Sequence, residues 1–311
     1  MAARQLDPGP DESVWARRLA GGPRFSCALG WGVGQALEGF WRNVFSGVRP
    51  GARVLELGCG SGDVSIWAAE AGRGLKIVAT DVFADPDGVR RHPDVTFRGG
   101  VSAEALPFAD AAFDMVVSNF AIEYADDLDA AAAEAARVLR PGGCGALVLH
   151  SADSTLTANS RALLETEALL AQAGIPDRVR RAAALRADHL SRRKLLKDVL
   201  RQRPDFPAPP LGVSGADYFD IAERLLKGDA AAPRDLETLE GALPMRLEIC
   251  RRQAGVALDG PALGRLAGRM SDRGLSVQIS ELTCTYDTLV TQKVGWIALL
   301  TRAVQGRLPE G

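Results

Sequence analysis

Short apolar runs alternate with helical patterns in the first half of the chain. Runs of apolar and β-branched residues, bounded by Gly, Pro or Asp, lie at 52–57, 75–81, 95–100, 113–119 and 144–150. Between them, residues 63–72 and 127–143 have the spacing of helices. The second of these begins at Asp126 or Asp127 and ends at a Pro-Gly-Gly sequence. The repeated order of strand, helix and strand predicts an α/β, doubly wound parallel sheet.

The pattern changes after His150. Residues 151–274 carry helical periodicity without clear strands, and strand-like runs return at 275–285 and 294–303. We therefore expect a seven-stranded sheet domain formed by residues 51–150 and 275–304, with a helical insertion after the fifth strand. Residues 1–50 hold the aromatic residues Trp15, Phe25, Trp31 and Trp41 and are expected to form a short N-terminal helical arm.

Composition excludes several classes of protein. The chain has 311 residues, 47% of them hydrophobic, which is enough for a full core, and its formal net charge of −2 gives no global attraction to nucleic acid or an anionic membrane. The five cysteines are far apart, no CxxC pair occurs, and only three histidines are present, so no metal site is predicted. No run of about 18 apolar residues occurs. These features favour a reduced, cytoplasmic protein without membrane insertion.

The candidate chemistry gathers where the predicted strands end. In open parallel sheets, ligands bind beyond the carboxyl ends of the strands. The first strand is followed by Gly58, Cys59, Gly60 and Gly62, and the second strand ends at Asp81 and Val82. Three glycines within five positions allow a sharp turn and a close approach of a ligand to the main chain. A carboxylate at the position of Asp81 can bind both hydroxyls of a ribose.

Two kinds of nucleotide cofactor compete for such a crevice. A dinucleotide fingerprint needs a small residue at its sixth position, so that the pyrophosphate meets a helix N-terminus. This chain has Asp63 there and Glu56 two residues before the first glycine. Carboxylates on both sides would repel a pyrophosphate, but they suit S-adenosyl-L-methionine, which carries an ammonium and a sulfonium.

Four ordered motifs carry a family resemblance. The sequences "VLELGCGSGD", "VATDV", "SAEALPFADAAFDMVVSNFAIEY" and "EAARVLRPGGCGALVLH" resemble class I S-adenosylmethionine-dependent methyltransferases, and are most similar to the ubiquinone and menaquinone biosynthesis type. The resemblance covers about residues 51–150 and implies a Rossmann-like fold. It also implies that Glu56, Gly58 and Gly60 form the methionine side of the site and that Asp81 binds the ribose. Ser102 and Ala103 would border the adenine, and Ser118 and Asn119 would line the floor near the methyl group.

The chain departs from this family at two places. Many relatives have an aspartate for the adenine amino group where this chain has Ser102. Quinone-type enzymes often have two histidines after the fourth strand, where this chain has Glu123 and Tyr124. Glu123, Tyr124 and His150, which ends the fifth predicted strand, are the candidate catalytic residues for orienting or deprotonating an acceptor.

These observations predict an enzyme that transfers a methyl group from S-adenosyl-L-methionine to a small-molecule acceptor. An NAD(P)-dependent oxidoreductase and a non-catalytic cofactor-binding relative are the alternatives. The insertion, residues 151–274, is expected to form a cap that selects the acceptor. Its basic stretch, residues 178–203, lacks interleaved aromatic residues, which favours a solvated helix face over nucleic-acid binding. A homodimer is left open.

Overall fold

The computed structural model describes residues 31–82, 92–185, 188–205, 218–286 and 290–304. These residues form two compact units. The sheet unit contains the described residues up to Thr157 and from Val256 onward. The helical unit is Ala158–Gly255.

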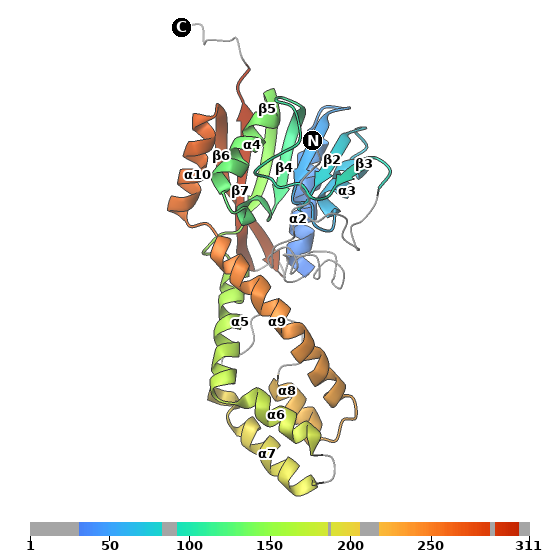
Figure 1. Ribbon diagram of the computed structural model, residues 1–311, viewed down its shortest axis with the longest axis vertical. Helices are drawn as coiled ribbons and strands as arrows, with labels where there is room; N and C mark the ends of the chain where they lie inside the picture. Colours follow the sequence, from blue (N-terminus) through green and yellow to red (C-terminus); the bar gives the residue numbers. More distant parts are fainter. Residues whose placement is uncertain (1–30, 83–91, 186–187, 206–217, 287–289, 305–311) are drawn as a thin grey trace. The chain divides into compact units, whose positions relative to one another are not determined.

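The sheet unit is built on seven strands in the order β3-β2-β1-β4-β5-β7-β6 (Figure 1). Neighbouring strands among β1 to β5 pair in parallel, whereas β7 runs antiparallel to both β5 and β6. The strands are β1 (Arg53–Leu57), β2 (Lys76–Thr80), β3 (Val95–Arg98), β4 (Phe113–Asn119), β5 (Leu139–Leu149), β6 (Leu275–Tyr286) and β7 (Val290–Arg302). The expected seven-stranded, doubly wound sheet is confirmed. The carboxyl ends of β1 to β5 therefore lie along one edge.

Helices cover both faces of this sheet. The helices of the sheet unit are α2 (Trp31–Ser46), α3 (Asp63–Glu70), α4 (Leu128–Val138) and α10 (Gly260–Asp272), with a short 3-10 helix η1 (Ile122–Tyr124). Met115 and Val117 of β4 enter a core with α2 and α3, whereas Val116 between them enters a second core with α4 and α10. Successive side chains of a strand point to opposite faces, so an uninterrupted apolar strand needs both layers.

The segment before the sheet contributes to the core. Trp41 and Phe45 of α2 are fully buried, and their rings stack at a centroid distance of 5.7 Å. Trp15 and Phe25, which the sequence placed in the same arm, lie outside the described residues. Asp127 is the N-cap of α4, where its side chain accepts hydrogen bonds from the backbone N–H groups of Asp129 and Ala130.

The helical unit has a core of its own. It contains most of α5 (Thr155–Gln172) and α9 (Ala232–Val256), all of α6 (Ile175–Ala184), α7 (His189–Arg201) and α8 (Tyr218–Leu226), and the 3-10 helix η2 (Arg203–Asp205). Apolar side chains of α6, α7 and α8 pack together with the end of α5 and the start of α9. No helix in the described parts of the chain is both long and apolar enough to cross a membrane.

The structure places the boundary of the insertion differently from the sequence. The sequence assigned residues 151–274 to one helical segment, but α10 packs on the sheet unit. Leu263, Leu266 and Met270 of α10 are buried in the same core as the side chains of α4. Periodicity alone does not show which partner receives an apolar helix face, so the sequence could not separate α10 from α9.

The basic stretch 178–203 is divided between α6 and α7 rather than forming one helix face. Much of its charge is paired within the helical unit. Arg180 forms ion pairs with Asp177 and Glu240, at 2.7 and 2.8 Å. Arg192 donates a hydrogen bond to the carbonyl oxygen of Leu225 at 2.9 Å. These contacts agree with an interpretation of the stretch as a paired and solvated surface.

Candidate active site

The loop between β1 and α3 makes the sharp turn that its glycines suggest. Gly58, Gly60 and Gly62 all have positive φ angles, of 65°, 51° and 81°. At Gly58 the lack of a side chain is also required by a neighbour, because a Cβ there would lie 2.4 Å from the Cβ of Ala121. Ala121 follows β4, so Gly58 lets the loops after β1 and β4 touch each other.

Asp81 joins the end of β2 to this glycine loop. Its carboxylate accepts a hydrogen bond of 2.8 Å from the backbone N–H of Gly60, and its side chain is buried. The N–H of Cys59 donates to the carbonyl oxygen of Thr80 at 2.9 Å, which fixes the loop against β2. Val82, the next predicted site residue, is 39% exposed. The structure thus brings the predicted ribose carboxylate and the glycine loop together.

Glu56 is a buried carboxyl group without a basic partner in the described part of the chain. It is only 1% exposed, and the Ser65 hydroxyl of α3 donates a hydrogen bond to its Oε2. Burial, reinforced by the charges of Asp81 and Asp63, raises the pKa of Glu56 to about 8, although the Ser65 hydrogen bond acts in the opposite direction. Within the described residues, no Lys or Arg forms an ion pair with Glu56.

Carboxylates also occupy the start of α3. Asp63 is the first residue of this helix and is buried, and its side chain accepts a hydrogen bond of 2.6 Å from the Ser61 hydroxyl. Burial and the charges of Glu56 and Asp81 raise the pKa of the Cys59 thiol well above its usual value. Cys59 therefore contributes its backbone to the site rather than a reactive thiolate.

The loop after β3 carries Ser102 and Ala103, both half-buried. The Ser102 hydroxyl accepts a hydrogen bond of 3.1 Å from the backbone N–H of Glu104, so it holds the local turn. Ala103 packs against the core beneath α4. The structure places both residues beyond the end of β3, on the same edge as Asp81.

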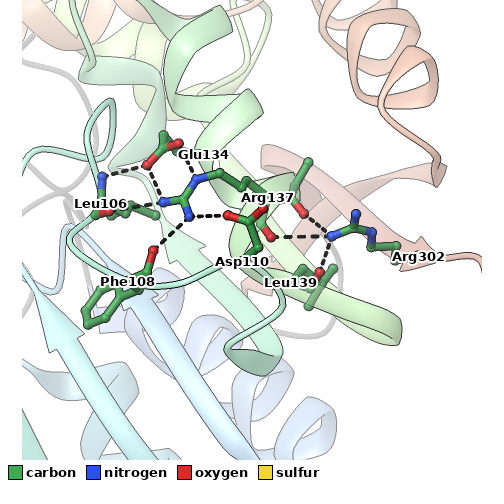
Figure 2. A network of polar contacts seen from close by, with 8 residues as sticks. Leu106, Phe108, Asp110, Glu134, Arg137, Leu139 and Arg302 are labelled. Carbon is green, nitrogen blue, oxygen red and sulfur yellow. Dashed lines mark hydrogen bonds and ion pairs between the residues drawn. The ribbon is translucent and has the colours of Figure 1, made fainter.

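Arg137 of α4 fastens the continuation of this loop (Figure 2). It donates hydrogen bonds to the carbonyl oxygens of Leu106 and Phe108, at 3.1 and 2.7 Å, and forms ion pairs with Asp110 and Glu134. Hydrogen bonding by Arg137 holds the pKa of Glu134 below its usual value. The role of Arg137 as a loop anchor follows from tertiary contacts, which the local sequence does not report.

Arg302 of β7 closes the end of the same helix. Its guanidinium donates hydrogen bonds to the carbonyl oxygens of Ala136, at 2.7 Å, and of Leu139 (Figure 2). The last carbonyls of a helix lack partners within the helix, so an arginine from another strand can satisfy them.

Ser118 and Asn119 end β4 and have different surroundings. Ser118 is fully buried, and its hydroxyl donates to the Leu57 carbonyl oxygen at 3.1 Å and accepts from the Ile122 N–H at 3.0 Å. The side-chain oxygen of Asn119 accepts a hydrogen bond of 2.9 Å from the indole N–H of Trp41. Ser118 therefore ties β1 to η1, and Asn119 ties β4 to α2.

The three predicted catalytic residues come together at the ends of β4 and β5. His150 Nδ1 lies 2.7 Å from Glu123 Oε1, and the His150 backbone N–H donates to the same oxygen at 2.9 Å. The rings of Tyr124 and His150 meet edge to face, with centroids 5.6 Å apart. Both the Glu123 and the His150 side chains are fully buried.

Two residues at this end were not found from the sequence. Phe120 has a φ of 50°, and its ring lies 4.4 Å from that of His150 between centroids. A Cβ at Gly295 of β7 would lie 2.9 Å from the Phe120 ring, so this glycine makes room for it. A positive φ in a bulky residue has no sequence signature. Within the described ranges, no three His, Cys, Asp or Glu side chains are placed to hold a metal ion.

This combination of strand order and loops defines a class. A parallel sheet extended by an antiparallel strand between its fifth and sixth strands, with a glycine loop after β1 and a carboxylate after β2, is the Rossmann-like fold of class I S-adenosylmethionine-dependent methyltransferases. Sequence comparison agrees, because residues 55–147 match the methyltransferase domain family. The resemblance to methyltransferases inferred from the motifs is thereby confirmed for this segment.

Curated relatives match between 31% and 44% of the chain. An uncharacterized protein of Mycobacterium tuberculosis is 39% identical over 105 residues, which cover 32% of this chain and 37% of that protein. A demethylmenaquinone methyltransferase of Beutenbergia cavernae is 41% identical over 99 residues, covering 31% of this chain and 40% of the relative. A malonyl-[acyl-carrier protein] O-methyltransferase of Methylococcus capsulatus is 34% identical over 149 residues, covering 44% and 53%.

The similarity does not extend over whole proteins. The matched segments span about half or less of the length of these relatives. Among solved structures, the phosphoethanolamine N-methyltransferase 2 of Haemonchus contortus in complex with S-adenosyl-L-methionine has 17% sequence identity and a TM-score of 0.40, covering 98% of this chain and 61% of that one. The curated relatives therefore support the methyltransferase class for less than half of the chain.

Proposed function

We propose that the protein transfers a methyl group from S-adenosyl-L-methionine to a small organic acceptor. The observation that carries this proposal is the buried Glu56 carboxyl group, which lies beside the glycine loop without a basic partner in the described part of the chain. A buried acid without a countercharge is costly to ionise unless a ligand supplies the cation. The ammonium group of S-adenosyl-L-methionine is such a cation.

The residues present fit the rest of this cofactor. Asp81 can accept hydrogen bonds from the two ribose hydroxyls while it still holds the Gly60 N–H. Ser102 and Ala103 lie at the same edge and can line the adenine, and Ser118 and Asn119 at the end of β4 can line the floor near the methyl group. When bound, the cofactor supplies an activated methyl group. The protein then has to align the acceptor with that group and exclude water.

An oxidoreductase that uses a nicotinamide dinucleotide fits less well. In that class the pyrophosphate lies at a helix N-terminus, which provides a partial positive charge. Here the buried Asp63 begins α3 and is held by Ser61, so a carboxylate already occupies this position. Glu56 and Asp81 add two further acidic groups nearby.

Titration calorimetry with S-adenosyl-L-methionine, and separately with NADH, tests the cofactor. We expect binding of the first and none of the second, and the formation of S-adenosylhomocysteine when an acceptor is present. A protein that binds S-adenosyl-L-methionine but forms no S-adenosylhomocysteine with any fraction of a metabolite extract would be a non-catalytic relative. Binding of NADH alone would contradict the proposal.

The acceptor is less defined than the cofactor. The names of the relatives give a demethylmenaquinone and a malonyl group on acyl carrier protein as acceptors. For this chain we retain the broader class of a small organic acceptor, with action in the cytoplasm and without nucleic acid as a partner. A homodimer is compatible with this function.

The helical unit is assigned to acceptor selection. It enters the chain directly after β5, and a segment of this size exceeds a simple connection. It contains an open pocket of about 530 Å³ lined by Arg180, Arg251, Glu240 and Tyr218 together with aliphatic side chains of α9. Aromatic and aliphatic side chains with a few polar groups suit a small organic molecule.

Hydrogen exchange tests the assignment of the helical unit. S-adenosylhomocysteine alone should protect amides around Gly58 and Asp81, and adding the identified acceptor should extend protection to α6, α8 and α9. Amides of α10 are the internal control, because this helix packs on the sheet unit. If the acceptor protects only the loops of the sheet unit, the helical unit has another role.

A further inference from the structure

The Glu123–His150 pair is a buried polar unit, and two of its atoms have no hydrogen-bonding partner among the described residues. Both side chains are fully buried, and Glu123 Oε1 receives the His150 backbone N–H as well as the contact with Nδ1. His150 Nε2 and Glu123 Oε2 make no hydrogen bond within the described parts of the chain. Buried polar atoms are nearly always paired, so an unpaired imidazole nitrogen indicates a site for a ligand atom or a proton.

The contacts of Glu123 determine which nitrogen carries the proton. A carboxylate only accepts hydrogen bonds, and Oε1 faces Nδ1 at 2.7 Å. Nδ1 must therefore donate its proton to Glu123 in the neutral imidazole, which leaves a lone pair on Nε2. The second hydrogen bond, from the His150 backbone N–H, prevents the carboxylate from turning away. His150 is thus arranged as a proton acceptor, and Glu123 as the residue that orients it.

The pair lies at the edge of the sheet where parallel sheets of this kind bind their ligands. Glu123 follows β4 and His150 follows β5, at the carboxyl edge of the sheet. The loop that contains Glu123 touches the glycine loop through Ala121 and Gly58. The rings of Phe120 and Tyr124 lie against the imidazole. Phe120 is buried, whereas Tyr124 is partly exposed, so displacement of the Tyr124 ring is the direct way for an acceptor to reach Nε2.

We propose that His150, oriented by Glu123, accepts the proton of the methyl acceptor. The acceptor class is therefore a hydroxyl, an amine or an activated carbon that must lose a proton, and not an ionised carboxylate or a thioether. The acceptor's electron pair forms the new bond to the methyl carbon, the bond from that carbon to sulfur breaks with its electrons going to sulfur, and the acceptor's proton passes to Nε2. The Glu123 carboxylate balances the charge of the imidazolium that forms. This inference rests on the proposed methyl transfer and narrows its substrate.

Nitrogen-15 NMR of histidine-labelled protein tests the tautomer without any acceptor. The chain has three histidines, and the resonances of His150 are those that disappear in His150→Gln. We expect the proton on Nδ1 and a bare Nε2. In Glu123→Gln the tautomer populations should shift while the affinity for S-adenosyl-L-methionine stays the same. A proton on Nε2 in the wild-type protein overturns the inference, since that atom could not then accept one.

Transfer of a labelled methyl group tests the chemistry. Methyl-labelled S-adenosyl-L-methionine and a small-molecule metabolite extract are incubated with wild type, His150→Gln, Glu123→Gln and His92→Gln. Loss of a general base lowers turnover by about 10² to 10⁴-fold, so the rate of label transfer in His150→Gln should fall by this factor. The rate in Glu123→Gln should lie between those of His150→Gln and the wild type. His92 is partly exposed before β3 and serves as the matched control, expected to keep full activity. The Kd of the cofactor, unchanged in all variants, shows that each is folded.

The products separate this inference from the proposed function. Label on an oxygen, nitrogen or carbon that previously carried a proton supports the inference, as does the loss in His150→Gln. Label on a carboxylate oxygen or a thioether sulfur, or full transfer by His150→Gln, overturns it and leaves the methyltransferase activity standing. A wild-type protein that binds no S-adenosyl-L-methionine contradicts the proposed function itself.

Discussion

Two glutamates, one beside the glycine loop and one after β4, differ in their partners rather than in their burial. Glu56 in β1 is 1% exposed and Glu123 in η1 is 4% exposed. Among the described residues, Glu56 receives hydrogen bonds only from Ser65, whereas Glu123 receives an imidazole and a backbone N–H. A buried carboxyl that has a neutral donor as its partner suits a ligand cation. One that holds a histidine instead orients a proton acceptor.

The loop after β1 meets the loop after β4 at Gly58 and Ala121. A methyl group added at Gly58 should have the largest effect on stability. Gly58→Ala forces a side chain into positive φ, which costs about 1–2 kcal/mol, and a clash with Ala121 adds about 1–3 kcal/mol. Chemical denaturation should therefore show a loss of about 2–5 kcal/mol in the free energy of unfolding. The double variant Gly58→Ala with Ala121→Gly should recover the part due to the clash. No recovery would mean that only backbone strain matters.

Removal of Asp81 affects the cofactor end alone. Asp81→Ala loses charge-assisted hydrogen bonds of about 1.5–3 kcal/mol, so calorimetry should show 10- to 100-fold weaker binding of S-adenosyl-L-methionine. Asp81→Asn keeps an acceptor for the Gly60 N–H, so its affinity for S-adenosyl-L-methionine should lie between those of the wild type and Asp81→Ala. The tautomer of His150 should not change in either variant. Unaltered affinity in Asp81→Ala would remove Asp81 from the cofactor site.

The raised pKa of Glu56 predicts a pH dependence of cofactor affinity. Because this pKa is about 8 in the free protein, the carboxyl is protonated at neutral pH and must ionise to bind an ammonium. The Kd should fall by up to about tenfold per pH unit as the pH rises toward 8. Above this pH the ligand's own amino group loses its charge, so affinity should decline again.

Glu56→Gln is the matched control for this pH dependence. It keeps a hydrogen-bonding side chain of the same size but cannot ionise. It should therefore lose the rise of affinity between neutral pH and pH 8 (the acid limb) and keep the decline above pH 8 (the alkaline limb). S-adenosylhomocysteine carries the same amino group and should show the same acid limb with the wild-type protein. An acid limb that persists in Glu56→Gln would assign the ionisation to another group.

The smallest expected effect concerns the loop after β3, which we propose borders the adenine. Arg137→Gln removes the guanidinium contacts to Leu106, Phe108, Asp110 and Glu134, and should lower the free energy of unfolding by about 1 kcal/mol, because these groups are partly exposed. The pKa of Glu134 is lower in the folded protein than in the unfolded chain. The stabilisation that Glu134 contributes is therefore complete above the unfolded pKa and is lost as the pH falls through the folded pKa. This acid-dependent stabilisation should be missing in the variant.

Much of the sheet could be predicted because its strands are apolar runs that can be recognised from local sequence. Residues 113–119 and 144–150 are apolar runs with clear ends, and the structure places β4 and β5 there, although β5 begins earlier, at Leu139. This extension arises because Leu139 pairs with Phe113. Such pairing depends on a distant strand, and local sequence does not report it. The boundary of the helical unit was missed for the same reason.

The sequence by itself determined the alternation of elements, the glycine turn after the first strand and the carboxylate after the second, because turns and strand ends are local properties of the chain. It also supplied Glu123, Tyr124 and His150 as separate candidates. Only the tertiary structure decided that Glu123 and His150 form one buried pair, that Arg137 anchors the loop after β3, and that α10 belongs to the sheet unit. The partners in these contacts are between 27 and 29 residues apart in the first two cases. Which residues meet at such separations is determined by strand order and burial rather than by local sequence.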